Sequence, residues 1–140
     1  MNFFYSKINA VFALFIMLLS LSILQACNRN PYTDGQALYK QYCSNCHMDD
    51  GTGLGTLIPP LAGADFLKNA DLGVICIIKH GISGKMIVND IEYDNIMPAN
   101  PKLSEVEVAN IANYIHNAWG NQREFISLDQ VKKILSQCQK

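Results

Sequence analysis

The most apolar stretch of the chain lies near its N-terminus. An almost unbroken run of apolar residues extends from Ala10 to Leu24, and Lys7 precedes it with a positive charge. The run is too short for a comfortable membrane-spanning helix and matches the apolar region of a signal peptide. We therefore expect residues 1–26 to be a signal peptide that exports the rest of the chain to an oxidising compartment.

The apolar run ends in Leu24-Gln25-Ala26-Cys27, which resembles the processing box of bacterial lipoproteins. Cys27 would then be the lipidated N-terminus, and residues 27–33 a tether that holds the protein on the periplasmic side of a membrane. Several acyl chains on one residue anchor a domain stably, whereas a single chain is marginal. The alternative is an ordinary signal peptide cut nearby, which leaves Cys27 free. The choice between inner and outer membrane stays open.

Two helices are predicted in the first half of the remaining chain. Thr33 and Gln36 have the spacing of a capping box, which predicts a helix from Thr33 toward Cys43. A second helix is predicted from Asp65 to about His80, although its apolar centre, residues 74–78, also fits a buried strand by periodicity alone. Glycines and prolines between the two stretches predict a long loop.

The strongest helical pattern comes in the second half. Ser104 has a glutamate and Ser127 a glutamine three residues later, a spacing that predicts a helix start at each serine. Apolar residues at helical spacing continue the first of these helices to about Trp119. Residues 86–88 and Ile91 look extended but are too short for a sheet. The prediction is a small all-α fold with long loops and a short extra C-terminal helix.

The composition describes a small and nearly neutral protein. The 140 residues suffice for one domain, and 11 basic against 12 acidic residues leave a net charge of −1. This balance gives no reason to expect nucleic acid as a partner. A loop-rich core of this size would be marginal without a large apolar cofactor to fill it.

The sequence Cys43-Ser44-Asn45-Cys46-His47 has the C-x-x-C-H pattern of covalent haem attachment. Thiols at positions i and i+3 lie on one helix face, where they can form thioethers with two vinyl groups on one porphyrin edge. The histidine that follows brings an imidazole nitrogen to the iron. A zinc site would need a second ligand pair, and a thioredoxin-like pair would need a βαβ context. A structural disulfide would leave His47 unexplained.

With this motif the chain resembles the monohaem class I cytochromes c, over about Asp34 to Asn121. The resemblance implies a haem-binding domain over residues 34–121, one covalent haem c, and an extension over residues 122–140 outside the general pattern. The resemblance rests on three features. Gly35, Tyr39 and Cys43 have the family's spacing of glycine, aromatic residue and first haem cysteine, and Pro60–Gly63 resembles the turn that supports the haem histidine. Tyr114 matches the aromatic residue that lies beside the glycine where the C-terminal helix crosses the first one. Asp90 departs from the pattern, because glycine often follows the Val-Asn pair.

Met97 is the predicted second axial ligand of the haem iron. It lies in a loop well past the haem motif, and Pro98 stiffens the backbone that follows it. In the resembling family, a methionine before proline supplies this ligand. Methionine–histidine ligation raises the reduction potential relative to two histidines, which favours oxidising partners.

The other candidate ligands are interpreted as structural. Met48 adjoins His47 and cannot reach the opposite face of a haem, and Met86 lies in an apolar segment that it helps to fill. His80 is a candidate cap for the end of its helix, where a cation is favoured. His116 lies on the polar side of its helix and is interpreted as solvated.

Two classes of function remain. The first is an electron carrier between membrane or periplasmic redox enzymes, with no small-molecule substrate, because residues 81–121 look like cytochrome domains that accompany periplasmic dehydrogenases, reductases and terminal oxidases. The second is a haem enzyme or sensor, such as a peroxidase or a gas-binding protein, with a displaceable distal ligand. Peroxidases of the c-type carry two haem motifs and this chain shows one, which favours the carrier.

Two cysteines have no role in these assignments, Cys76 and Cys138. In an oxidising compartment they could pair and fix the last helix to the haem domain. The bond would close a loop of about sixty residues, which is worth a few kcal/mol in the chain-entropy model. The alternative is that Cys76 is a small buried hydrophobe and Cys138 a terminal thiol. The sequence leaves both possibilities open.

Overall fold

The computed structural model describes residues 11–19, 31–69 and 73–138. The chain divides into two units, Met1–Pro31 and Tyr32–Lys140, and each is described by itself. In the first unit, residues 11–19 are helical. No helix within the described ranges is both long and apolar enough to span a membrane. The lipidation predicted at Cys27 lies outside the described residues.

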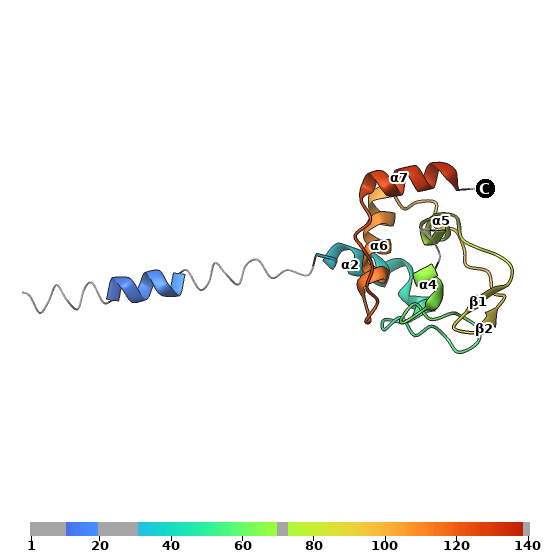
Figure 1. The fold of residues 1–140 in the computed structure, drawn as a ribbon, viewed down its shortest axis with the longest axis horizontal. Helices are drawn as coiled ribbons and strands as arrows, with labels where there is room; N and C mark the ends of the chain where they lie inside the picture. Colours follow the sequence, from blue (N-terminus) through green and yellow to red (C-terminus); the bar gives the residue numbers. More distant parts are fainter. Residues whose placement is uncertain (1–10, 20–30, 70–72, 139–140) are drawn as a thin grey trace, which may run out of the picture. The chain divides into compact units, whose positions relative to one another are not determined.

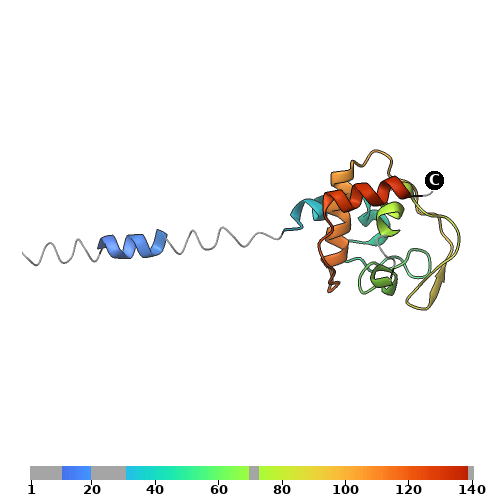
Figure 2. The same ribbon diagram turned by 45° about the horizontal axis from the view of Figure 1, so that its top comes forward.

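The second unit is mainly helical, which confirms the predicted all-α class (Figure 1). Figures 1 and 2 both show the last helix lying across the helix before it in the sequence, as their contacts also indicate. The elements follow in the order α2 (Thr33–Tyr42), α3 (Ser44–His47), α4 (Asp65–Asn69), α5 (Gly73–His80), β1 (Met86–Val88), β2 (Ile91–Tyr93), α6 (Glu105–Asn117) and α7 (Leu128–Gln137).

The crossing of α2 and α6 depends on a glycine. A Cβ atom at Gly35 would overlap the carbonyl oxygen of Asn110 and lie 2.7 Å from the Cβ of Tyr114. Only a residue without a side chain allows the two backbones to approach this closely. Tyr114 therefore lies beside Gly35, as the resemblance implied.

Helix boundaries in the first half differ from the prediction. The N-cap of α2 is Tyr32, so Thr33 is the first helical residue and the capping box predicted there is wrong. A capping residue has to lie just outside the helix, with non-helical dihedral angles. The helix predicted over Asp65–His80 corresponds to α4 and α5, and residues 70–72 between them lie outside the described residues. Residues 74–78 lie within α5, so the alternative of a strand is wrong.

The extended segments pair, although they were expected to be too short for a sheet. Strands β1 and β2 form an antiparallel hairpin in which Met86 faces Tyr93 and Val88 faces Ile91. The turn consists of Asn89 and Asp90, with φ angles of 51° and 63°. A two-residue turn with two positive φ angles matches the twist of the flanking strands, and asparagine and aspartate tolerate it better than most residues. This tolerance explains how the turn forms without the glycine common in the resembling family.

The two capping boxes of the second half are confirmed. At the start of α6, the Glu107 carboxylate accepts from the Ser104 backbone N–H at 2.7 Å, and the Ser104 hydroxyl accepts from the Glu107 N–H at 3.3 Å. Ser127 makes the same reciprocal pair at the start of α7. Helix α6 ends at Asn117, slightly before the predicted Trp119.

The segment after α6 folds back and covers one side of that helix. The Asn113 side chain donates to the Ile126 carbonyl at 2.9 Å and accepts from the Ile126 N–H at 2.8 Å. Val131 of α7 is fully buried, and so is His116 of α6. The prediction that His116 is solvated is wrong. The polar face of α6 was predicted to be exposed to solvent, but α7 and the segment that joins it to α6 cover this side of the helix.

Candidate functional site

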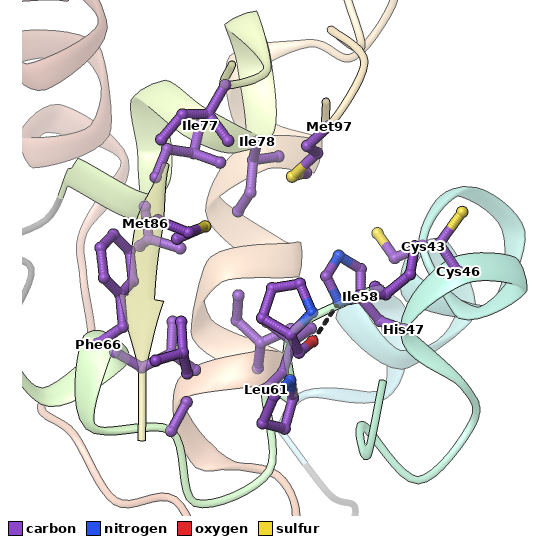
Figure 3. Close-up of a pocket in the computed structure, with 18 of the residues that line it drawn as sticks. Cys43, Cys46, His47, Ile58, Leu61, Phe66, Ile77, Ile78, Met86 and Met97 are labelled. Atoms are coloured by element: carbon purple, nitrogen blue, oxygen red, sulfur yellow. Dashed lines mark hydrogen bonds between the residues drawn. The ribbon is translucent and has the colours of Figure 1, made fainter. Parts of the chain in front are cut away.

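The C-x-x-C-H motif lies at the junction of α2 and α3. Cys43 is the C-cap of α2 and the N-cap of α3, and its carbonyl accepts from the N–H groups of Cys46 at 3.1 Å and His47 at 3.0 Å. This tight turn brings both thiols to the same mouth of a cleft, which His47 also borders (Figure 3). Cys43 is half-buried and Cys46 exposed. Burial raises the pKa of the Cys43 thiol to about 11, with the nearby Cys46 as a second cause, so this thiol stays protonated.

The orientation of His47 is fixed by a backbone carbonyl. Its Nδ1 lies 3.1 Å from the oxygen of Pro59, and because a carbonyl can only accept, Nδ1 carries the proton. The other ring nitrogen, Nε2, is then unprotonated and available to a metal. Burial lowers the pKa of His47, which keeps the imidazole neutral. The expected support was the turn Pro60–Gly63, but the atom that holds the ring belongs to the preceding residue.

A glycine-containing loop holds Pro59 in place. The Gly53 N–H donates to the His47 carbonyl at 3.1 Å, and the Gly51 carbonyl accepts from Leu61 and Ala62. Gly53 has φ +70°, and a Cβ there would lie 2.7 Å from the Pro59 carbonyl carbon and oxygen. The loop can therefore turn this closely under the histidine only with glycine at this position.

An aromatic cluster supports the motif from the α2–α6 crossing. The ring of Tyr39 lies 5.4 Å from that of Tyr114 and 5.0 Å from that of Trp119. The Tyr39 hydroxyl donates to the Met48 carbonyl at 2.6 Å, directly after the haem motif. Burial raises the pKa of Tyr39, so the hydroxyl keeps the proton that this bond needs. Tyr39 thus links the predicted Gly35-Tyr39-Cys43 pattern to the position of His47.

Met97 borders the same cleft from a loop that α5 holds. Its backbone exchanges two hydrogen bonds with Ile82, at 3.0 and 2.9 Å. A Cβ at Gly81, which has φ +73°, would overlap the Met97 carbonyl oxygen and lie 2.8 Å from the Ala99 nitrogen. Figure 3 shows the Met97 sulfur directed into the cleft that the His47 ring enters. The structure thus brings together the four side chains that the sequence singled out: Cys43, Cys46, His47 and Met97.

Of the other candidate ligands, only Met86 borders the cleft, where it is half-buried on β1. Met48, His80 and His116 do not line it. His80 is exposed at the end of α5. His116 is fully buried away from the cleft, and neither ring nitrogen has a hydrogen-bond partner.

The walls of the cleft are apolar and uncharged. No aspartate, glutamate, lysine or arginine is among the described residues that line it. Its walls come from the loop after α3, from α4, α5 and α6, and include Ile58, Pro59, Pro60, Leu61, Phe66, Leu67, Val74, Ile77, Ile78, Ile111 and Ile115. At the rim, Tyr42, Leu57 and Ile96 are 41%, 55% and 74% exposed. Two thiols, an imidazole and a thioether around an apolar slot fit a flat, largely apolar iron porphyrin.

Cys76 and Cys138 lie together outside the lining of this cleft. Their Cα atoms are 5.7 Å apart, and the two sulfurs are joined as a disulfide. The bond links α5 to the residue that follows α7.

Comparison with known proteins gives a consistent result. A family model described as cytochrome c oxidase, cbb3-type, subunit III, matches residues 30–115. A cytochrome c-552 from Thermus thermophilus is 30% identical over 129 residues, which are 86% of this chain and 82% of that protein. The cytochrome c subunit of a quinone alcohol dehydrogenase from Gluconobacter oxydans is 25% identical over 71% of this chain, but only 21% of the subunit is matched. The cbb3-type oxidase subunit CcoP of Rhodobacter capsulatus is 30% identical over 64% of this chain and 30% of its own length.

The match covers the haem motif, the apolar cleft and most of α6, and it is accompanied by a relative matched over most of both lengths. The chain belongs to the family of cbb3-type cytochrome c oxidase subunit III, and it is a c-type cytochrome that carries electrons on a covalently bound haem.

Proposed function

We propose that the chain carries one electron at a time on a single haem that Cys43 and Cys46 attach and that His47 and Met97 ligate. The observation that carries this proposal is the convergence of these four side chains, from two distant segments, on one uncharged cleft (Figure 3). When bound there, a haem supplies an iron centre that gains or loses one electron.

Each residue has a definite role in this proposal. Cys43 and Cys46 would hold the haem through two thioether bonds; each S–H would add across one vinyl double bond, with sulfur on one carbon, the proton on the other and no leaving group. His47, held by Pro59, presents a neutral Nε2 lone pair. Met97 presents its sulfur from a loop fixed to Ile82. The apolar walls exclude water, which keeps the surroundings similar in both redox states.

A closed distal position distinguishes this carrier from an enzyme or a gas sensor, and we propose that the chain has no catalytic activity of its own. The test is carbon monoxide binding by the dithionite-reduced protein at neutral pH. A carrier with Met97 on the iron should bind carbon monoxide poorly, whereas Met97→Ala should bind it readily. Rapid binding by the unaltered protein would support the enzyme or sensor instead.

The proposed partners are redox enzymes of the dehydrogenase, reductase or terminal oxidase classes. Two kinds of relative support this, since one is a subunit of a quinone alcohol dehydrogenase and another a subunit of a cbb3-type oxidase. The uncharged rim of the cleft suits a transient contact around the haem edge. Co-purification from membranes of the source organism would identify which class it serves.

We further propose that residues 1–26 are a signal peptide, that Cys27 is lipidated, and that residues 34–121 form the haem domain on the periplasmic side of a membrane. The Leu24–Cys27 sequence supports the anchor. Metabolic labelling with palmitate should mark the protein, and Cys27→Ala should move it from the membrane to the soluble fraction. Retention of the variant in the membrane fraction would contradict the anchor.

A further inference from the structure

The C-terminal segment is fixed to two different helices. At its beginning, Asn113 of α6 holds both backbone groups of Ile126. At its end, Cys138 is bonded to Cys76 of α5. Between these points α7 contacts both α5 and α6, with Val131 fully buried. The segment is therefore a strap that holds α5 against α6.

Helix α5 is also the element that holds the loop of Met97. The C-terminal end of this helix provides two backbone acceptors and one cation to that loop. The Asn100 N–H donates to the Lys79 carbonyl at 3.2 Å, and the Asn100 side chain donates to the Ile78 carbonyl at 3.2 Å. The Lys79 ammonium donates to the carbonyls of Pro101, at 3.0 Å, and Leu103. Gly81 caps the helix by donating to the Ile77 carbonyl at 2.8 Å.

One short helix thus connects the disulfide to the distal side of the cleft. Cys76 lies outside the cleft lining, while its neighbours Ile77 and Ile78 form part of the wall. Directly after the helix, Gly81 lies close to the Met97 carbonyl and Ile82 exchanges two backbone hydrogen bonds with Met97. A displacement of α5 would therefore move the wall and the Met97 loop together.

We infer that the Cys76–Cys138 disulfide is a positioning device for the distal ligand, and that its reduction makes the distal position of the haem exchangeable. The inference rests on the proposed role of Met97. Both cysteines are half-buried, so a reductant can reach them. The reductant is a dithiol: it gives two electrons and two protons to the disulfide, which becomes two thiols, and is itself oxidised to a disulfide. Reduction releases α7 from α5, and α5 then holds the Met97 loop less tightly.

The test compares two ways of reducing the same haem protein. Ascorbate reduces the iron and leaves disulfides intact, whereas excess dithiothreitol reduces both, and alkylation with mass analysis shows which state the cysteines are in. Carbon monoxide should bind on the order of tenfold faster to the dithiothreitol-reduced protein, which corresponds to about 1.4 kcal/mol of lost restraint. Cys138→Ser should bind at the fast rate with either reductant.

A loss of stability alone should not have this effect. Val108→Ala removes buried apolar contacts of α6 outside the cleft lining and leaves the disulfide in place, so it should lower the melting temperature without speeding carbon monoxide binding well below it. Equal rates with the two reductants, or a disulfide that resists excess dithiol in the folded protein, would overturn the inference. If the unaltered oxidised protein lacked the sulfur-to-iron charge-transfer band, the role of Met97 itself would fail, so the two failures are distinguishable.

Discussion

At the scale of single residues, the site depends on groups that fix its ligands as well as on the ligands. The Pro59 carbonyl determines which nitrogen of His47 is protonated, and Gly81, directly after α5, allows the backbone there to approach Met97. Such supporting groups set ligand basicity and orientation. Changes at the ligands should therefore alter the spectrum directly.

Replacing Met97 by alanine should remove the weak sulfur-to-iron charge-transfer band at the red edge of the visible spectrum of the oxidised protein. The reason is that Met97 is the proposed sulfur ligand of the iron, and its side chain lines the cleft. The reduction potential should fall as well, because methionine ligation raises it. Met86→Ala is the matched control, since Met86 borders the same cleft, and it should keep the band. If Met86→Ala lost the band and Met97→Ala kept it, the ligand assignment would be reversed.

His116 should make stability depend on pH. Burial, with the Arg123 guanidinium as a second cause, lowers its pKa from 6.5 to about 4. Above pH 6.5 the imidazole is neutral in both the folded and the unfolded chain and contributes nothing. As the pH falls from 6.5 to 4, His116 becomes protonated in the unfolded chain but stays neutral in the folded protein. The free energy of unfolding therefore decreases, by roughly 3 kcal/mol in total.

The measurement is the free energy of unfolding across this pH range, from denaturant titrations of the haem protein. His116→Leu should flatten the profile without loss of stability at neutral pH, because both ring nitrogens are unpartnered in the fold. His80→Gln, at an exposed position, is the control and should keep the slope. An unchanged slope in His116→Leu would contradict this assignment.

The sequence was sufficient to predict those site residues that lie next to one another along the chain. Cys43, Cys46 and His47 are recognisable because their spacing alone creates the site. The Pro59 carbonyl was missed because every residue has a carbonyl, so no side-chain pattern marks the one that meets a histidine. His116 was misjudged because the polarity of one helix face does not reveal what packs on it.

At the scale of elements, the crossing of α2 and α6 is the contact that positions the haem motif. Gly35→Ala should destabilise the protein by about 1–3 kcal/mol, since the new Cβ would overlap the Asn110 carbonyl and crowd Tyr114. The melting temperature of the haem protein measures this. Gly73→Ala is the control, because nothing lies within 4 Å of a Cβ there, and it should be neutral or stabilising. Equal effects of both substitutions would refute the role assigned to the crossing.

Helix starts were predictable where reciprocal side-chain bonds define them. Ser104 and Ser127 form complete capping boxes, and both were predicted. The same spacing at Thr33 misled, because the chain enters its helix one residue earlier. The hairpin was missed since three-residue strands have too few positions to show a period, and their pairing depends on the turn at Asn89 and Asp90.

At the scale of the whole molecule, the mouth of the cleft is where a redox partner would approach. Ile96, at 74% exposed, borders the cleft at this mouth. Ile96→Lys should lower the second-order rate constant of electron transfer with the physiological partner, on the order of tenfold, by placing a hydrated charge in an apolar contact. Val106→Lys, exposed on α6 outside the cleft, is the control and should keep the rate. A larger effect of Val106→Lys would place the docking surface elsewhere.

The arrangement of distant segments around the cofactor is the part that the sequence predicted only through the resemblance. Helical patterns identify α6 as amphipathic, but they do not indicate that Ile111 and Ile115 face the same slot as Met97. Nor do they decide whether Cys76 meets Cys138, since 62 residues separate them. These proximities arise because several elements pack around one apolar cleft.

The most direct test of the account is the pyridine haemochrome spectrum of the protein after denaturation and acid–organic extraction. The account predicts that the haem stays with the polypeptide, one per chain, with a spectrum that indicates two thioether bonds. Cys46→Ala should shift the spectrum to that of a single thioether or abolish maturation, whereas Cys138→Ser should leave it unchanged. Haem that leaves the denatured protein intact with the organic phase would contradict the central claim that Cys43 and Cys46 hold it covalently.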